Sequence, residues 1–126
     1  MLDILIAEDE PAILESLEFI LRRNGWSVAA ARDGETALAD VGRLRPRLLL
    51  LDIMLPRKSG LDVLKAIRSD PAIGRIPVLI LTARGQRYDR QLAEELRADG
   101  FITKPYANSE VVDEVRRLLA AASADG

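Results

Sequence analysis

Polar side chains follow several apolar segments of this 126-residue chain, at points where a hydrophobic core has no use for them. They are Glu8, Asp9, Glu10, Asp52, Thr82 and Lys104. Asp52 directly follows four consecutive leucines, so a large desolvation cost would fall on its carboxylate if it had no partner. Carboxylates that converge also repel one another, which raises a pKa or requires a cation.

A hard divalent cation would relieve this repulsion, because Mg²⁺ takes oxygen ligands. Lys104 is the other available countercharge, and its place at the end of an apolar run favours an ion pair with Asp52. Thr82 would add a hydroxyl donor to the same pocket. This group predicts a metal-assisted phosphoryl site in which a carboxylate is the nucleophile. For Glu10, directly before Pro11, we favour a role at the N-terminus of the following helix.

Composition excludes several other chemistries. The chain has no cysteine and no histidine, which rules out disulfides, thiol nucleophiles and imidazole catalysis by its own residues. Its formal net charge of −2 carries no signature of nucleic-acid or membrane-surface binding. We find no signal peptide and no apolar run long enough to span a bilayer, so we expect a cytoplasmic protein of one domain.

Apolar segments alternate with amphipathic ones along the whole chain. The apolar segments expected to form strands are residues 2–7, 26–31, 47–52, 77–82 and 101–103. Helical spacing of apolar residues predicts helices that begin near residues 11, 33, 59, 86 and 108. The helix over 86–98 has the thinnest apolar stripe and should be the least firmly anchored. This alternation predicts a doubly wound α/β sheet, in which ligands bind beyond the carboxyl ends of the strands.

Over residues 1–121 the sequence resembles the receiver domain of two-component response regulators. The motifs that carry the resemblance are Ile-Leu-Ile-Ala-Glu8-Asp9-Glu10, Leu-Leu-Asp52-Ile-Met-Leu-Pro-Arg-Lys-Ser-Gly60, Leu-Thr82-Ala83 and Thr-Lys104-Pro105-Tyr. The resemblance implies a (βα)5 flavodoxin-like fold, with five parallel strands in the order 2-1-3-4-5. Residues 122–126 would then be a tail or the stump of a linker.

The resemblance also implies that Asp52 is a phosphoacceptor, which receives a phosphoryl group from a histidine kinase or a histidine phosphotransfer protein. Mg²⁺ (or Mn²⁺) would be held by Glu8, Asp9, Asp52 and the backbone carbonyl of Met54. Such a domain assists its own phosphorylation and dephosphorylation, and it is not an enzyme with an external metabolite substrate.

Further residues acquire roles only through this resemblance. Lys104 would contact the phosphoryl oxygens, and Thr82 would bond one of them once the group is in place. Phe101 would be the aromatic residue of the switch, turning inward as Thr82 moves. The residues expected to line the mouth of the site are Met54, Ala83 and Arg84. The Lys104–Pro105 peptide would be cis, an isomer that proline tolerates.

The fourth helix, the fifth strand and the last helix would form the face that changes on phosphorylation. This face only partly resembles the dimerisation face of the winged-helix transcription factors, because Glu114 stands where they have an arginine and Gly100 where they have an acidic residue. The partial resemblance leaves a phosphorylation-dependent homodimer as one expectation, although these two departures remove two of its ion pairs. A downstream protein target or a missing output domain is another, with no direct nucleic-acid or membrane binding by this chain.

A different class of function stays open at this point. A receiver-like interaction module would act by binding alone, without phosphorylation, and metal-dependent labelling of Asp52 would separate the two classes. A flavodoxin-like cofactor binder fits less well, because the acidic residues 8–10 would repel a phosphate in the absence of a metal.

Overall fold

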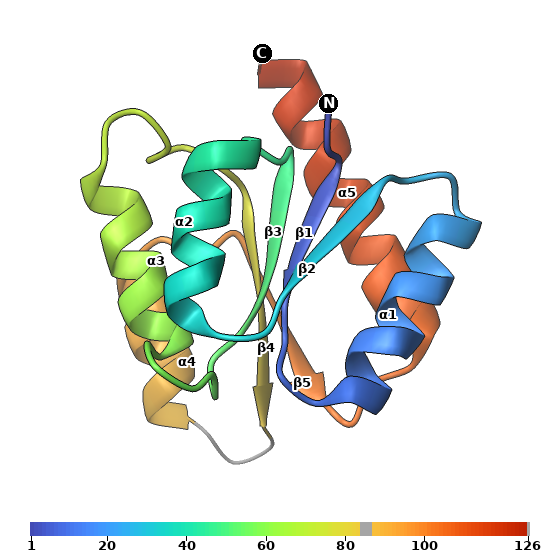
Figure 1. Ribbon diagram of the computed structural model, residues 1–126, viewed down its shortest axis with the longest axis horizontal. Coiled ribbons are helices and arrows are strands. Elements are labelled where there is room, and N and C mark those ends of the chain that lie inside the picture. Colours follow the sequence, from blue (N-terminus) through green and yellow to red (C-terminus); the bar gives the residue numbers. More distant parts are fainter. Residues whose placement is uncertain (84–86, 126) are drawn as a thin grey trace.

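The chain folds as five strands that alternate with five helices, described for residues 1–83 and 87–125 in a computed structural model (Figure 1). The strands are β1 (Ile4–Ala7), β2 (Val28–Ala31), β3 (Leu48–Asp52), β4 (Val78–Ala83) and β5 (Gly100–Lys104). The helices are α1 (Pro11–Arg23), α2 (Gly34–Leu44), α3 (Gly60–Ser69), α4 (Arg87–Glu95) and α5 (Asn108–Asp125). Every predicted element is present, with ends that differ by a few residues from the sequence pattern.

The strands form one parallel sheet in the order β2-β1-β3-β4-β5, which confirms the predicted topology. Two apolar layers enclose it, with α1 and α5 on one face and α2, α3 and α4 on the other (Figure 1). Successive side chains of a strand point to opposite faces. Thus Leu49 and Leu51 pack with the α2–α3 layer, whereas Leu48 and Leu50 pack with the α1–α5 layer. This double burial explains the unbroken leucine run.

Local sequence signals set the ends of the helices. The Ser59 side chain accepts a hydrogen bond from the Asp62 backbone N–H at 3.2 Å, as its position before α3 predicted. Asp33 caps α2 in the same way, through the Thr36 N–H at 2.7 Å. Glu10 does occupy the N-cap position of α1, but its side chain makes no capping hydrogen bond, so only its charge acts on that helix end.

The two C-terminal helices differ in how they are anchored. Among the described side chains of α4, only Ala93 is fully buried, in agreement with the thin apolar stripe in the sequence. By contrast α5 buries several apolar side chains and continues through Asp125, into the segment expected to be a tail. Among the described residues, no helix has the length and apolar character needed to cross a membrane.

Candidate functional site

The parallel register brings two acidic residues together at the carboxyl end of the sheet. Ala7 pairs with Leu51 across β1 and β3, so Glu8 and Asp52, the next residue along each strand path, are neighbours. Both are buried, with exposed fractions of 0% for Glu8 and 4% for Asp52. Two adjacent carboxylates with almost no access to water are a costly arrangement unless other groups compensate them.

Lys104 supplies part of that compensation from the end of β5. Its Nζ donates to Asp52 Oδ2 at 2.8 Å and to Glu8 Oε2 at 3.3 Å, so the predicted ion pair with Asp52 is present and Glu8 shares it. Backbone groups occupy the remaining carboxylate oxygens. Asp52 Oδ1 accepts from the Met54 N–H at 2.9 Å, and Glu8 Oε1 accepts from the Glu10 N–H at 3.1 Å.

The pKa values of Glu8 and Lys104 are shifted because charged groups lie close together in this pocket. Burial and the adjacent Asp52 carboxylate raise the pKa of Glu8 from its ordinary value to about 7. Burial alone would lower the pKa of Lys104, but the hydrogen bond and negative charge of Asp52, together with Glu8, outweigh it and raise that pKa. Lys104 therefore stays charged, while the pocket favours protonation of one carboxylate near neutral pH.

Asp9 completes a set of oxygen ligands. One carboxylate oxygen each from Glu8, Asp9 and Asp52 lies within 4.8 Å of the other two, and Asp9 is more exposed than its two neighbours. This set fits Mg²⁺ by its chemistry, because the ion prefers carboxylate oxygens and retains several waters. It also fits by charge, since three carboxylates face the single ammonium of Lys104. A divalent cation would compensate the excess negative charge.

The other predicted site residues lie at different distances from the acidic side chains and differ in exposure. Thr82 is buried in β4, one residue beyond Leu81, which pairs with Asp52 across the sheet. Met54 places its side chain in solvent, 66% exposed, although its backbone N–H bonds Asp52. Ala83 ends β4, whereas Arg84 lies outside the described residues. The Lys104–Pro105 peptide is cis, as expected.

Phe101, the expected switch aromatic, lies in β5 and is partly buried against the α2–α3 layer. The guanidinium of Arg90, on α4, sits over its ring at 5.1 Å from the centroid. This contact joins the weakly anchored helix to the strand that carries Lys104.

On α5, Glu114 and two arginines form bonds with other residues of this chain. Glu114 pairs with Arg117 at 2.9 Å, and Arg117 Nη2 also donates to the Asp99 carbonyl at 3.4 Å. Arg116 donates to Asn24 Oδ1 at 3.2 Å and lies over the Trp26 ring. The glutamate that departs from the winged-helix pattern thus has an internal partner.

Sequence reasoning assigned no role to Gly60, the first residue of α3. A Cβ atom at this position would collide with the carbonyl oxygen of Asp52, and the Gly60 N–H donates to the Ile53 carbonyl at 2.9 Å. The glycine lets the β3–α3 loop close tightly against the backbone of the acidic residue. Gly60 ends one of the motifs that carry the resemblance and directly follows the Ser59 cap, but neither fact reveals the close contact.

Comparison with known proteins agrees with this geometry. Residues 4–116 match the family model of the response regulator receiver domain. The chain is 40% identical over 119 residues to the sensory transduction protein RegX3 of Mycobacterium tuberculosis, covering 94% of this chain and 51% of the relative. It thus spans about half the length of the curated relatives it matches.

Solved structures give the same result. A response regulator from Chloroflexus aurantiacus has a TM-score of 0.89 at 33% identity, covering 94% of this chain and 97% of the other. The receiver domain of a sensor histidine kinase from Pseudomonas aeruginosa has a TM-score of 0.86 at 28% identity, covering 94% and 98%. That second structure has a magnesium ion coordinated in its active-site cleft. With its sheet order, its acidic pocket and the family match over residues 4–116, this chain belongs to the receiver-domain family of response regulators.

Proposed function

We propose that this domain accepts a phosphoryl group on Asp52 from a histidine kinase or a histidine phosphotransfer protein. The observation that carries the proposal is the buried pair of Glu8 and Asp52 with Lys104 bonded to both and Asp9 beside them. An ordinary structural ion pair needs one carboxylate. A pocket with three carboxylates and one ammonium is suited to a divalent cation and to added phosphoryl oxygens.

Each polar residue of the pocket can perform one part of the phosphoryl transfer. Bound Mg²⁺, held by Glu8, Asp9, Asp52 and the Met54 carbonyl, would neutralise negative charge on the transferred group. An oxygen of Asp52 attacks phosphorus, the bond from phosphorus to the donor nitrogen breaks, and that nitrogen keeps the electron pair. Lys104 leaves its bond with Asp52 Oδ2 and follows the phosphoryl oxygens, and Thr82 donates its hydroxyl to one of them. Attack by water at phosphorus then breaks the bond from phosphorus to the Asp52 oxygen, which restores the carboxylate and releases inorganic phosphate.

The response would pass from this pocket to the surface formed by α4, β5 and α5. Lys104 and Phe101 share β5, so a change at the phosphoryl group reaches the ring and the Arg90 guanidinium that covers it. The small buried area of α4 makes this helix the element that moves at the lowest cost. The output is then a downstream protein or an output domain, and the altered surface is also available for a phosphorylation-dependent homodimer.

Intact mass measurement tests the phosphoacceptor role. The purified chain is incubated with acetyl phosphate, with and without Mg²⁺, beside the variants Asp52→Asn and Asp62→Asn. We expect one phosphoryl adduct that requires Mg²⁺, is absent from Asp52→Asn and is retained by Asp62→Asn, whose exposed carboxylate lies on α3. If Asp52→Asn also forms the adduct, or if no variant forms it, the proposal is rejected and a module that acts by binding alone is favoured.

A further inference from the structure

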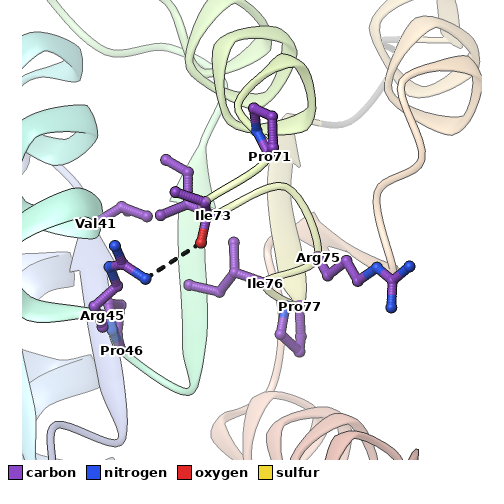
Figure 2. Close-up of a pocket in the computed structure, with 9 residues that line it drawn as sticks. Val41, Arg45, Pro46, Pro71, Ile73, Arg75, Ile76 and Pro77 are labelled. Carbon is purple, nitrogen blue, oxygen red and sulfur yellow. Dashed lines mark hydrogen bonds between the residues drawn. The ribbon is translucent and has the colours of Figure 1, made fainter.

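A groove lies at the opposite end of the sheet from the acidic pocket. Its walls are the end of α2 and the loop between α3 and β4, next to Pro46 and Pro77, which precede β3 and β4 (Figure 2). The cavity has a volume of about 260 Å³. Val41, Pro46 and Ile73 form a buried apolar floor. None of these residues takes part in the phosphoryl site, so the groove requires its own explanation.

Hydrogen bonds hold the walls of this groove in place. Arg68 Nη1 donates to the Gly74 carbonyl at 3.1 Å and to the Ile76 carbonyl at 2.7 Å, and the Arg68 side chain is itself only 8% exposed. On the other side, Arg45 Nη1 donates to the Ala72 carbonyl at 3.3 Å across the mouth (Figure 2). A groove that is already formed binds its occupant with little cost of ordering.

Two arginines flank the groove without acidic partners. Among residues 1–83 and 87–125, neither Arg45 nor Arg75 forms an ion pair, and both are exposed. Their neighbours differ: Arg43 pairs with Asp40 at 2.9 Å and Arg47 pairs with Asp3 at 3.0 Å. The positive charge at this groove is therefore available to a ligand that carries carboxylates.

We propose that this groove docks an acidic segment of a partner protein, with one large apolar side chain anchored on the floor of Val41, Pro46 and Ile73. The cavity is smaller than the ~300–1,000 Å³ typical of small-molecule sites, and a single aromatic or aliphatic side chain suits it. The side chains of Arg45 and Arg75 lie on opposite sides of the apolar residues (Figure 2). An extended segment with acidic residues on both sides of its anchor reaches both arginines, and this docking does not depend on the phosphoacceptor role.

Amide spectra of the ¹⁵N-labelled chain test the proposal. The probe is a blocked pentapeptide, Glu-Asp-Trp-Asp-Glu, and the control peptide replaces each acidic residue by lysine. We expect shifts confined to the groove, at Arg45, Ala72 and Arg75 and their sequence neighbours. Reversing one rim charge with Arg75→Glu should weaken binding about tenfold. Arg32→Glu makes the same charge change at an exposed residue beyond the carboxyl end of β2, and it should leave affinity within about twofold.

Each other outcome rejects the proposal in a distinct way. Equal shifts with the lysine peptide would show that the carboxylates are not recognised. Equal or tighter binding of phenylbutyrate would identify a small apolar carboxylate as the occupant. Groove shifts that depend on protein concentration without peptide would identify a second copy of the chain. If millimolar peptide causes no amide shifts in the groove, the groove does not bind an acidic segment. Unchanged amides elsewhere in Arg75→Glu show that this variant is folded.

Discussion

The two ends of the parallel sheet handle charge in opposite ways. At the amino end, two carboxylates have matched donors: Asp3 accepts from the Ser27 N–H at 2.9 Å and pairs with Arg47, and Asp99 accepts from the Val78 N–H at 2.8 Å and pairs with Arg68. At the carboxyl end, three carboxylates share the one ammonium of Lys104.

Asp3 and Asp99 at the amino end are thus each paired with an arginine, whereas the carboxylates at the carboxyl end outnumber the ammonium that bonds them. The Ser27 N–H, with further help from Arg47, lowers the pKa of Asp3, whereas burial and Asp52 raise the pKa of Glu8 to about 7. Charges at the amino end stabilise the fold as it stands. Charges at the carboxyl end are held in a state that a bound cation or phosphoryl group would change.

The largest expected effect is a pH dependence of stability that comes from the carboxyl end. Folding raises the pKa of Glu8 from its ordinary value of 4.5 to about 7, so the folded state binds the proton more tightly. Its stabilising contribution is complete below the unfolded pKa and is lost as pH rises through about 7, by about 3 kcal/mol. Because the chain has no histidine, urea unfolding without divalent ions from pH 5 to 8 isolates this group.

Two controls define that experiment. Glu8→Gln should flatten the profile between pH 5 and 8. Added Mg²⁺ should reduce the loss at high pH, because a cation stabilises the ionised carboxylate. If the free energy of unfolding of Glu8→Gln still falls between pH 5 and 8, the titrating group is not Glu8. The carboxyl end of the sheet would then not differ from the amino end in this respect.

The next effect comes from the amino end. Arg68→Leu removes the donor of the Gly74 and Ile76 carbonyls and the partner of Asp99, so we expect a loss of about 2 kcal/mol in the free energy of unfolding. Arg43→Leu is the matched control. Its side chain is 69% exposed and, among the described residues, forms an ion pair with Asp40 alone, three residues earlier. Its replacement should cost less than about 0.5 kcal/mol. Equal losses of unfolding free energy in both variants would contradict a stabilising role for the buried Arg68 side chain.

A smaller effect, of opposite sign, returns to the acidic pocket. Asp9→Asn removes one of the mutually repelling carboxylates without breaking the bonds of Lys104. In buffer free of divalent ions it should raise the free energy of unfolding by about 1 kcal/mol. The same variant should lose the stabilisation that the parent chain gains from Mg²⁺. Denaturant titrations with and without Mg²⁺ measure both quantities, and a destabilised Asp9→Asn in the metal-free buffer would show that the pocket is not under charge repulsion.

The smallest effect concerns Phe101, which lies between the two ends. Arg90→Ala removes the guanidinium from the Phe101 ring and should lower stability by about 0.5 kcal/mol, since the Arg90 side chain is 54% exposed. Hydrogen exchange should report faster opening of α4, with β1 and β3 unchanged. Glu94→Gln, which removes only the partner of Arg90 within the helix, controls for the ion pair. If the hydrogen-exchange protection of α4 is unchanged in Arg90→Ala, the contact between Arg90 and the Phe101 ring does not stabilise this helix.

Several features were predictable from local sequence because their causes are local. The unbroken leucines of β3 predicted burial on both faces, and Ser59 predicted the start of α3, because both depend on neighbouring residues. The ion pair of Lys104 with Asp52 followed from their places at strand ends. The contact of Lys104 with Glu8 was not predicted, because it depends on how far a side chain from β5 crosses toward β1.

The sequence by itself determined the order of the elements, the apolar strands that must be central, and the polar residues that must meet beyond their carboxyl ends. Periodicity and strand direction are enough for these, since parallel strands bring their ends to one edge. Only the tertiary structure decided that Glu8 is fully buried, that Gly60 closes against Asp52, and that a groove opens at the amino end. These features arise where segments far apart in the chain meet, and packing distances there are not encoded in any local pattern.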